Sequence, residues 1–170
     1  MRHKKILIIG CAGAGKSTLS RKLHQLTGLP LIHLDRLYWQ PGWTPTERPV
    51  FREMMLAELQ KDAWIMDGNF DSTLSMRAQY ADLILWLDFP RHICFPRVVK
   101  RVVTNFGKTR PDMTPGCPEK LDIEFAKWIW RFEQDARPPI AEAVRQAPCD
   151  SIVFHHPQAL ASWLERISSN

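Results

Sequence analysis

The segment from Gly10 to Ser17 has the residue types and the spacing of a phosphate-binding loop. It reads G-x-x-x-x-G-K-S between a continuous apolar run, KILIIG, and a segment with helical periodicity. Glycines let the backbone turn tightly, so that consecutive N–H groups point toward phosphate oxygens at the helix N-terminus. Lys16 then reaches the β- and γ-phosphates, and Ser17 offers its hydroxyl to Mg²⁺. The predicted nucleotide-binding residues of this loop are Gly10, Ala12, Gly13, Ala14, Gly15, Lys16, Ser17 and Thr18.

A run of basic residues lies between positions 91 and 111, where six Lys or Arg residues occur without an acidic one. Phosphoryl transfer spreads negative charge over three equatorial oxygens, and an arginine that closes over them stabilises this charge. Arg110 lies in a loop at about 107–118 and is the first choice for this catalytic role, ahead of Arg131 and Arg137. The alternative is a solvated basic surface, which is the usual meaning of such a run.

Alternating apolar and helical segments predict the fold that positions these residues. The apolar runs lie at 5–10, 30–35, 63–68, 81–89 and 151–156. Helical periodicity is found at about 15–26, 48–62, 90–105, 119–136, 139–146 and 157–169. Five apolar runs separated by helices indicate a parallel sheet covered on both faces, an α/β fold with three layers. Pro96 should kink its helix or delay the start of that helix.

The composition fits a single domain over residues 1–170 that binds anionic partners. Of the 170 residues 45% are hydrophobic, and the formal net charge is +5. The charge does not choose among phosphates, nucleic acid and acidic membranes. The four cysteines lack the spacing of a zinc site or a disulfide framework, and no run approaches the roughly 18 apolar residues of a membrane helix. We expect a cytoplasmic protein without a membrane partner.

Missing motifs narrow the class of phosphate-loop protein. The chain has no N-K-x-D or D-x-x-G segment of a GTPase and no L-S-G-G-Q-type segment of an ABC ATPase. A short single domain with a loop that can serve as a lid suits a small-molecule kinase.

The order of elements resembles the adenylate-kinase-like family of P-loop nucleoside and nucleotide kinases over nearly the whole chain. The segments GCAGAGKSTLSRKL, HLDRLYWQPGW, WIMDGNFDSTLSMR, LDFPR and GKTRPDMTPGCPEKLD are similar to those of bacterial proteins labelled DNA topology modulation protein, or FlaR-related. The fold family implies a five-stranded parallel sheet of order 2-3-1-4-5, with ATP on the phosphate loop and an acceptor site beside it. We expect the short lid at about 107–118 and the acceptor side at about 36–62.

The resemblance also implies roles for two carboxylates. Asp67 matches an Asp-Gly pair that in adenylate kinases holds Mg²⁺ through water, and a turn or capping role is the alternative. The match stops after this pair, because Asn-Phe follows where adenylate kinases have Phe-Pro-Arg, which weakens the case for an AMP-type acceptor. Asp35 matches an Asp that contacts the acceptor hydroxyl in small-metabolite kinases and can serve as its base. An ion pair with Arg36 or a loop cap is the alternative for Asp35.

Two arginines, Arg97 and Arg101, stand four residues apart on one predicted helix. Adenylate kinases have two arginines at this place that flank the ATP base and reach its phosphates, so the resemblance assigns both residues to nucleotide binding.

Further residues are expected to bind the acceptor. Arg77 can bind a phosphate or carboxylate, and Tyr38, Trp39 and Trp43 can stack a ring or pack against their own domain. The expected acceptor-binding residues are Asp35, Arg36, Trp39, Asn69 and Arg77. Residues expected to be structural instead are Phe125, Trp128, Ile129, Phe132, His155 and His156.

The sequence leaves more than one function open. The leading prediction is a phosphotransferase that moves the γ-phosphoryl group of Mg-ATP to a nucleoside, a nucleotide or a small metabolite. The alternative is a nucleotide-dependent regulatory or DNA-associated protein without kinase turnover, although no nucleic-acid-binding motif supports it. An ATP-binding protein without transfer activity is also compatible with the sequence, because binding and transfer share the same loop.

Overall fold

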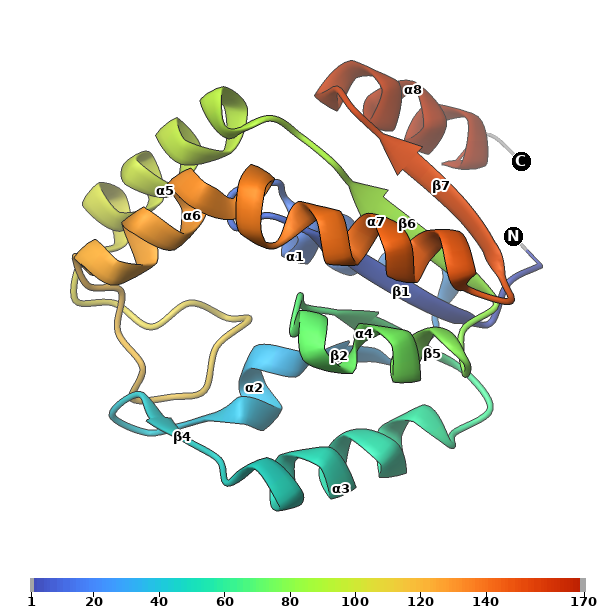
Figure 1. Ribbon diagram of the computed structural model, residues 1–170, viewed down its shortest axis with the longest axis horizontal. Helices are drawn as coiled ribbons and strands as arrows, with labels where there is room; N and C mark the ends of the chain where they lie inside the picture. The colour runs from blue at the N-terminus through green and yellow to red at the C-terminus, as the bar shows by residue number, and fades with distance from the viewer. Residues whose placement is uncertain (1, 169–170) are drawn as a thin grey trace.

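A five-stranded parallel sheet forms the centre of the computed structural model, which describes residues 2–168 (Figure 1). Its strands pair in the order β2-β5-β1-β6-β7, which is 2-3-1-4-5 when they are counted along the chain. All four pairings are parallel, so the predicted α/β architecture and strand order are confirmed. The strands are β1 (Lys5–Gly10), β2 (Leu31–His33), β5 (Trp64–Asp67), β6 (Leu83–Leu87) and β7 (Asp150–Phe154).

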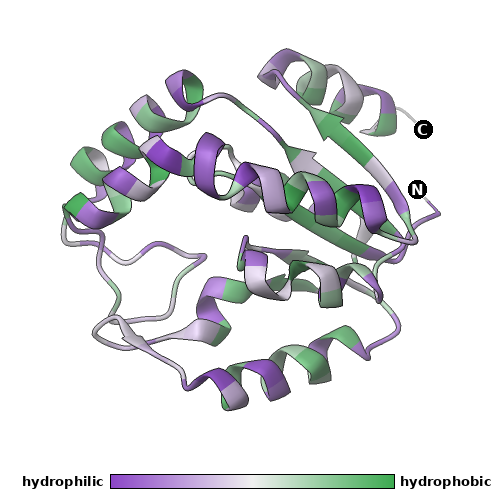
Figure 2. Ribbon diagram, in the orientation of Figure 1, coloured by the Kyte–Doolittle hydropathy of each residue, from purple (hydrophilic) through white to green (hydrophobic). Residues whose placement is uncertain are grey.

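Helices cover both faces of the sheet, which explains why its central strands are apolar without alternation (Figures 1 and 2). Helices α1 and α8 lie on one face, and α4 and α7 pack together on the other. Every residue of β5 and β6 is buried. The main helices are α1 (Lys16–Thr27), α3 (Arg48–Leu59), α4 (Asp71–Ala78), α5 (Arg91–Asn105), α6 (Ile123–Asp135), α7 (Arg137–Gln146) and α8 (Pro157–Ser168).

Three local features differ from the prediction. Strand β2 ends at His33, and the short helix α2 (Leu34–Tyr38) begins at once, so Asp35 lies in the first turn of a helix rather than at the end of a strand. An antiparallel hairpin of β3 (Trp39–Gln40) and β4 (Thr44–Pro45) follows, which the sequence did not indicate. Helix α5 contains Pro96 and still begins at Arg91, so the predicted delayed start is wrong.

A long segment separates α5 from α6. Helix α6 begins later than predicted because Asp122 caps it, accepting a hydrogen bond from the N–H of Phe125 at 3.0 Å. The long segment between α5 and α6 therefore keeps irregular structure. No helix within residues 2–168 is both long and apolar enough to cross a membrane.

Candidate active site

The phosphate loop lies between β1 and α1 and requires glycine at two positions. A Cβ atom at Gly10 would lie 2.5 Å from the carbonyl oxygen of Leu87, and one at Gly13 would lie 2.3 Å from that of Cys94. Both glycines also have positive φ, at 146° and 81°. The loop therefore packs directly against β6 and α5, and this close packing is possible because Gly10 and Gly13 have no Cβ atom.

Free backbone donors make this loop a fit for phosphate. The N–H groups of Gly13, Gly15, Lys16 and Ser17 have no hydrogen-bond partner within the described residues, and α1 has no side-chain cap. Such donors at a helix N-terminus bind anions. The Lys16 ammonium donates to the carbonyl oxygens of Gly10 and Cys11 at 2.8 and 3.1 Å, so it lies folded over the loop.

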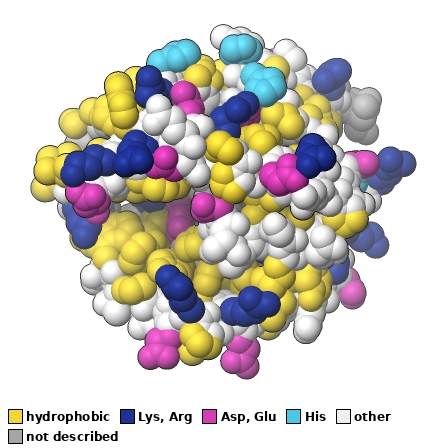
Figure 3. All heavy atoms as spheres, in the orientation of Figure 1, with side chains coloured by type: hydrophobic (Ala, Val, Ile, Leu, Met, Phe, Trp, Pro, Cys, Tyr) yellow, Lys and Arg dark blue, Asp and Glu magenta, His cyan; other side chains and the backbone are white. Residues whose placement is uncertain are grey.

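A cavity of about 950 Å³ opens beside the loop. It extends from α5, α6 and α8 to α2 and the end of β5, and Figure 3 shows a hollow with hydrophobic side chains between α6 and α3. Most of the predicted site residues line it. They are Ala12, Gly13, Ala14, Gly15, Lys16, Ser17, Thr18, Asp35, Trp39, Asp67, Asn69, Arg97, Arg101 and Arg110.

Asp67 ends β5 and is fixed by two neighbours. Its carboxylate accepts a hydrogen bond from the Ser20 hydroxyl at 2.7 Å and lies 2.7 Å from Nδ1 of His33, the residue opposite it in β2. Within the described chain no group of three or more His, Cys, Asp and Glu residues could hold a metal ion. Ser17 and Asp67, the predicted ligands of Mg²⁺, both line the cavity, and a Mg²⁺ ion bound mainly by phosphates and water needs only one or two protein carboxylates or hydroxyls.

Asp35 lies in the same cavity, close enough to the loop to be affected by its lysine. Burial raises the pKa of the Asp35 carboxyl, the charge of Lys16 opposes this shift, and Asp67 adds to it. Asp35 therefore lies beside the phosphate loop, where the sequence predicts the residue that accepts the proton of the acceptor.

The segment 107–118 folds over the phosphate loop and carries a network of charges. Arg110 Nη1 lies 2.6 Å from Asp112, and Arg110 Nε lies 2.5 Å from Glu119. Glu119 also binds Arg101, at 3.0 Å. Asp112 accepts a hydrogen bond of 2.8 Å from the hydroxyl of Ser17. Two of the predicted cations are therefore neutralised in this arrangement.

Asp112 is a site residue that the sequence reasoning missed. It is 6% exposed, and although burial opposes its charge, Arg110 and the Ser17 hydroxyl hold its pKa below the ordinary value. A carboxylate thus lies against the hydroxyl expected to bind Mg²⁺. The sequence signal that could have identified it is its position, two residues after Arg110 in the same loop, where a carboxylate can pair with that arginine.

The same segment also contacts the β3–β4 hairpin on the acceptor side. The N–H of Gly42 donates to the carbonyl of Gly116 at 2.8 Å, and the Trp43 indole donates to that of Pro118 at 3.0 Å. Trp39 packs edge-on against Tyr38 and Trp43. The segment therefore contacts both Ser17, at the end of the phosphate loop, and the hairpin.

Several predicted residues lie elsewhere. Arg36 is exposed and outside the cavity lining. Arg77 is fully buried and donates to the carbonyl oxygens of Gly68, Asn69 and Phe70, so it braces the turn after β5 instead of facing the cavity.

The two weaker candidates for the catalytic arginine lie outside the cavity lining as well. Arg131 pairs with Asp135 on the exposed face of α6, and Arg137 forms a two-pronged contact with Asp88 at 2.8 Å.

The aromatic residues of α6 divide between core and cavity. Ile129 and Phe132 are buried as expected. Phe125 and Trp128 stack at 5.9 Å between ring centres and line the cavity. Phe125 also packs against the core, whereas Trp128 is exposed, so the expectation of a core position is wrong for Trp128.

Comparison with known proteins identifies relatives by fold. No family model and no curated protein matches the sequence. Among solved structures, shikimate kinase from Acinetobacter baumannii in complex with shikimate is similar over 98% of this chain and 91% of its own, with a TM-score of 0.59 at 16% identity.

Two further structures are similar at this level. Shikimate kinase from Bacteroides thetaiotaomicron covers 98% of this chain and 97% of its own, with a TM-score of 0.57 at 17% identity. Deoxyadenosine kinase from M. mycoides with bound dATP covers 97% of both chains, with a TM-score of 0.53 at 16% identity. The chain thus has the fold of these P-loop kinases.

Proposed function

We propose that this protein is a phosphotransferase that moves the γ-phosphoryl group of Mg-ATP to a hydroxyl of a small-molecule acceptor. The observation that carries this proposal is the single cavity shared by the free donors of the phosphate loop, the carboxyl of Asp35 and the guanidinium of Arg110. The kinases of similar fold support the reaction class.

Each of these groups has a role in the transfer. The loop N–H groups bind the β- and γ-phosphates, and the Lys16 ammonium exchanges its carbonyl partners for phosphate oxygens. Ser17 and, through water, Asp67 would hold Mg²⁺, which would supply positive charge against the phosphates. Asp35 accepts the proton of the attacking hydroxyl, and Arg110 leaves its carboxylate partners to stabilise the transferring group.

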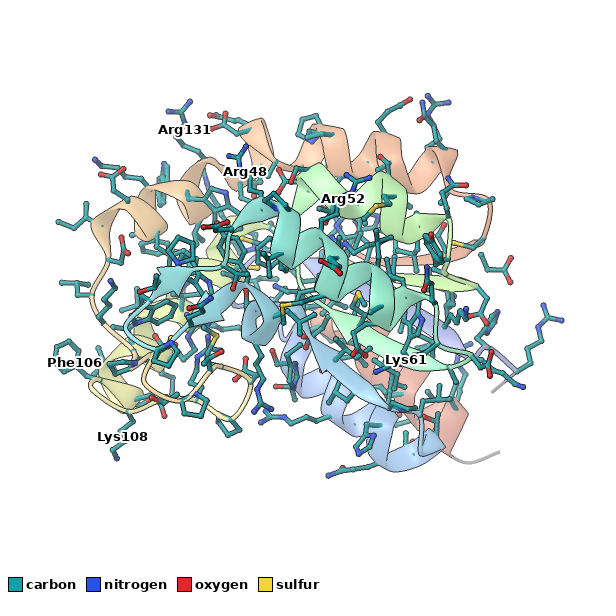
Figure 4. The ribbon with its side chains drawn as sticks, turned by 90° about the horizontal axis from the view of Figure 1, so that it is seen from below. Arg48, Arg52, Lys61, Phe106, Lys108 and Arg131 are labelled. Atoms are coloured by element: carbon teal, nitrogen blue, oxygen red, sulfur yellow. The ribbon has the colours of Figure 1, made fainter. Side chains whose placement is uncertain are left out.

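Acceptor-dependent release of ADP tests the proposal. Purified protein is assayed with Mg-ATP against a panel of nucleosides, nucleoside monophosphates, small sugars and hydroxy acids, and the phosphorylated product is identified by mass spectrometry. Lys16→Ala should reduce turnover at least about 10²-fold, the effect of losing one preorganised donor. Lys61→Ala, at an exposed lysine far from the lining (Figure 4), is the matched control and should leave turnover unchanged. ATP binding without transfer to any acceptor would refute the proposal.

A further inference from the structure

The two halves of the cavity differ in charge. The nucleotide half, formed by the phosphate loop, α1, α5 and the lid segment 107–118, contains all six basic residues of the lining. These residues are Lys16, Arg21, Lys22, Arg97, Arg101 and Arg110. An ATP molecule on the loop has cations on several sides.

The acceptor half, formed by α2, the hairpin and the turn from β5 into α4, has the opposite character. It carries the carboxylates of Asp35 and Asp71, with Asp67, the proposed partner of Mg²⁺, at its border, and within the described chain no Lys or Arg from these elements lines it. The two arginines of α3, Arg48 and Arg52, are exposed and outside the lining (Figure 4).

The cations that an anionic acceptor would need are engaged elsewhere. Arg77 is fully buried against three carbonyl oxygens. Arg110 is held between Asp112 and Glu119, at 2.6 and 2.5 Å. Lys16 and Arg110 act on Asp35 through their charges, but the proposed transfer assigns both to the phosphates of ATP. A phosphate or carboxylate on the acceptor would therefore lie near Asp carboxylates with no basic side chain from the elements of the acceptor half beside it. At about 5 Å and an effective dielectric constant of about 20, one such repulsion lowers affinity by roughly two orders of magnitude.

The remaining groups of this half suit a flat, uncharged ring. Trp39 and Phe70 line it, and Tyr38 holds both edge-on, with ring centres 4.8 and 4.9 Å away. Phe70 has a left-handed backbone, with φ of 39°, and such strain concentrates at binding sites. Asn69 Oδ1 accepts from the N–H of Gly10 at 3.0 Å, whereas its Nδ2 has no partner in the described chain and remains a donor.

The geometry points to an acceptor of nucleoside type, a neutral hydroxyl compound with a flat ring, and to discrimination against anionic acceptors such as nucleoside monophosphates. This inference rests on the proposed kinase function. The acceptor oxygen forms a bond to the γ-phosphorus while the bond from that phosphorus to the β–γ bridging oxygen breaks. ADP leaves, and the hydroxyl proton passes to Asp35.

Matched pairs of acceptors test the inference on the full chain. Adenosine, deoxyadenosine, cytidine and deoxycytidine are each compared with the corresponding 5′-monophosphate, and shikimate serves as a hydroxylated carboxylate. We expect the kcat/KM of at least one nucleoside to exceed that of its monophosphate by about 100-fold or more. A preference for a monophosphate or for shikimate would overturn the acceptor class and leave the kinase function standing, as would transfer only to ringless alcohols. Absence of Lys16-dependent transfer to every acceptor would overturn both.

A charge reversal in the acceptor half supplies a second readout. Asp71 lies exposed in the first turn of α4, so Asp71→Arg places a cation where the half has none. The ratio of kcat/KM for monophosphate over nucleoside should rise by about 10- to 100-fold. Asp62→Arg makes the same change of charge at an exposed residue outside the lining and should leave this ratio unchanged. Equal ratios in the two variants would refute the role of charge in acceptor selection.

Discussion

The contact between Asp112 and Ser17 places a negative charge at the loop to which the proposed function assigns the phosphates of ATP. Asp112→Asn removes that charge without changing the shape of the side chain. The Ser17 hydroxyl donates to the carboxylate at 2.8 Å, and the amide oxygen of the substituted side chain can still accept this hydrogen bond. The substitution also removes one of the two carboxylate partners of Arg110, whose Nη1 atom lies 2.6 Å from Asp112, while Glu119 remains. Both effects favour the binding of an anion to the loop.

The size of the effect follows from the position of Asp112. A phosphate on the loop lies within about 5 to 6 Å of a carboxylate that touches the serine of the motif. With an effective dielectric constant of about 20, two unit charges at that distance repel by about 3 kcal/mol, and solvent in the open cavity reduces this. We therefore expect Asp112→Asn to bind ATP more tightly by about 1 to 3 kcal/mol, or roughly 5- to 150-fold.

Isothermal titration calorimetry with ATP in EDTA measures this gain directly, because no Mg²⁺ then neutralises the phosphates. In excess Mg²⁺ the gain should be smaller. Asp135→Asn, at an exposed residue that pairs with Arg131 on α6, is the matched control and should bind ATP as the unaltered protein does. Equal or weaker binding of ATP by Asp112→Asn in EDTA would show that the lid carboxylate does not oppose the nucleotide.

Three further predictions concern the residues that build the site. Because burial raises the pKa of Asp35, the folded state binds its proton more tightly than the unfolded state, so Asp35→Asn should raise Tm at pH 7 and lose this advantage below about pH 4. The same substitution should lower kcat about 10²-fold or more. A Tm difference that does not depend on pH would contradict this argument. Arg77→Lys should lower the free energy of unfolding by about 3–5 kcal/mol, because three buried carbonyl oxygens lose the guanidinium that donates to them. The affinity for ATP, measured well below Tm, should stay unchanged, and a selective loss of this affinity would contradict the structural role. Gly13→Ala should lower the free energy of unfolding, measured with denaturant, by well over about 2 kcal/mol, because its Cβ would collide with the carbonyl of Cys94. Gly15→Ala should lower it by only about 1–2 kcal/mol, because a Cβ there meets no atom within 4 Å. Equal losses of stability would contradict the packing argument.

The phosphate loop and the sheet could be predicted because local patterns determine them. The loop has a fixed spacing after a buried strand, and unbroken apolar runs identify strands that are buried on both faces. The strand order came from a resemblance in the order of elements, and the sheet confirms it. Asp35 and Asp67 line one cavity because parallel strands bring their carboxyl ends to the same edge, whereas Arg110 reaches this cavity on the segment between α5 and α6.

The contacts that the sequence did not reveal are those that depend on tertiary geometry. The place of Arg77 depends on the turn after β5, which directs three carbonyl oxygens at one buried guanidinium. His33 faces Asp67 only because β2 and β5 pair in that register. Asp112 meets Ser17 across 95 positions of sequence, through a segment without regular structure. Residue type alone could not separate a cation in the cavity from one that braces a turn.

The charge of the cavity connects nucleotide binding with acceptor selection. Six basic and four acidic residues line it, a difference of two positive charges, and Mg-ATP carries about two negative charges at neutral pH. Under the proposed function, Mg-ATP would therefore balance the net positive charge of the lining, and an anionic acceptor would add negative charge that no basic side chain of the acceptor half balances. Asp112 supplies one of the four acidic residues of the lining, so Asp112→Asn should also raise the ratio of kcat/KM for monophosphate over nucleoside. The rise should be smaller than in Asp71→Arg, because Asp112 lies on the nucleotide side of the cavity. If this ratio rose more in Asp112→Asn than in Asp71→Arg, the charge that discriminates against anionic acceptors would lie in the segment 107–118 instead of on α4.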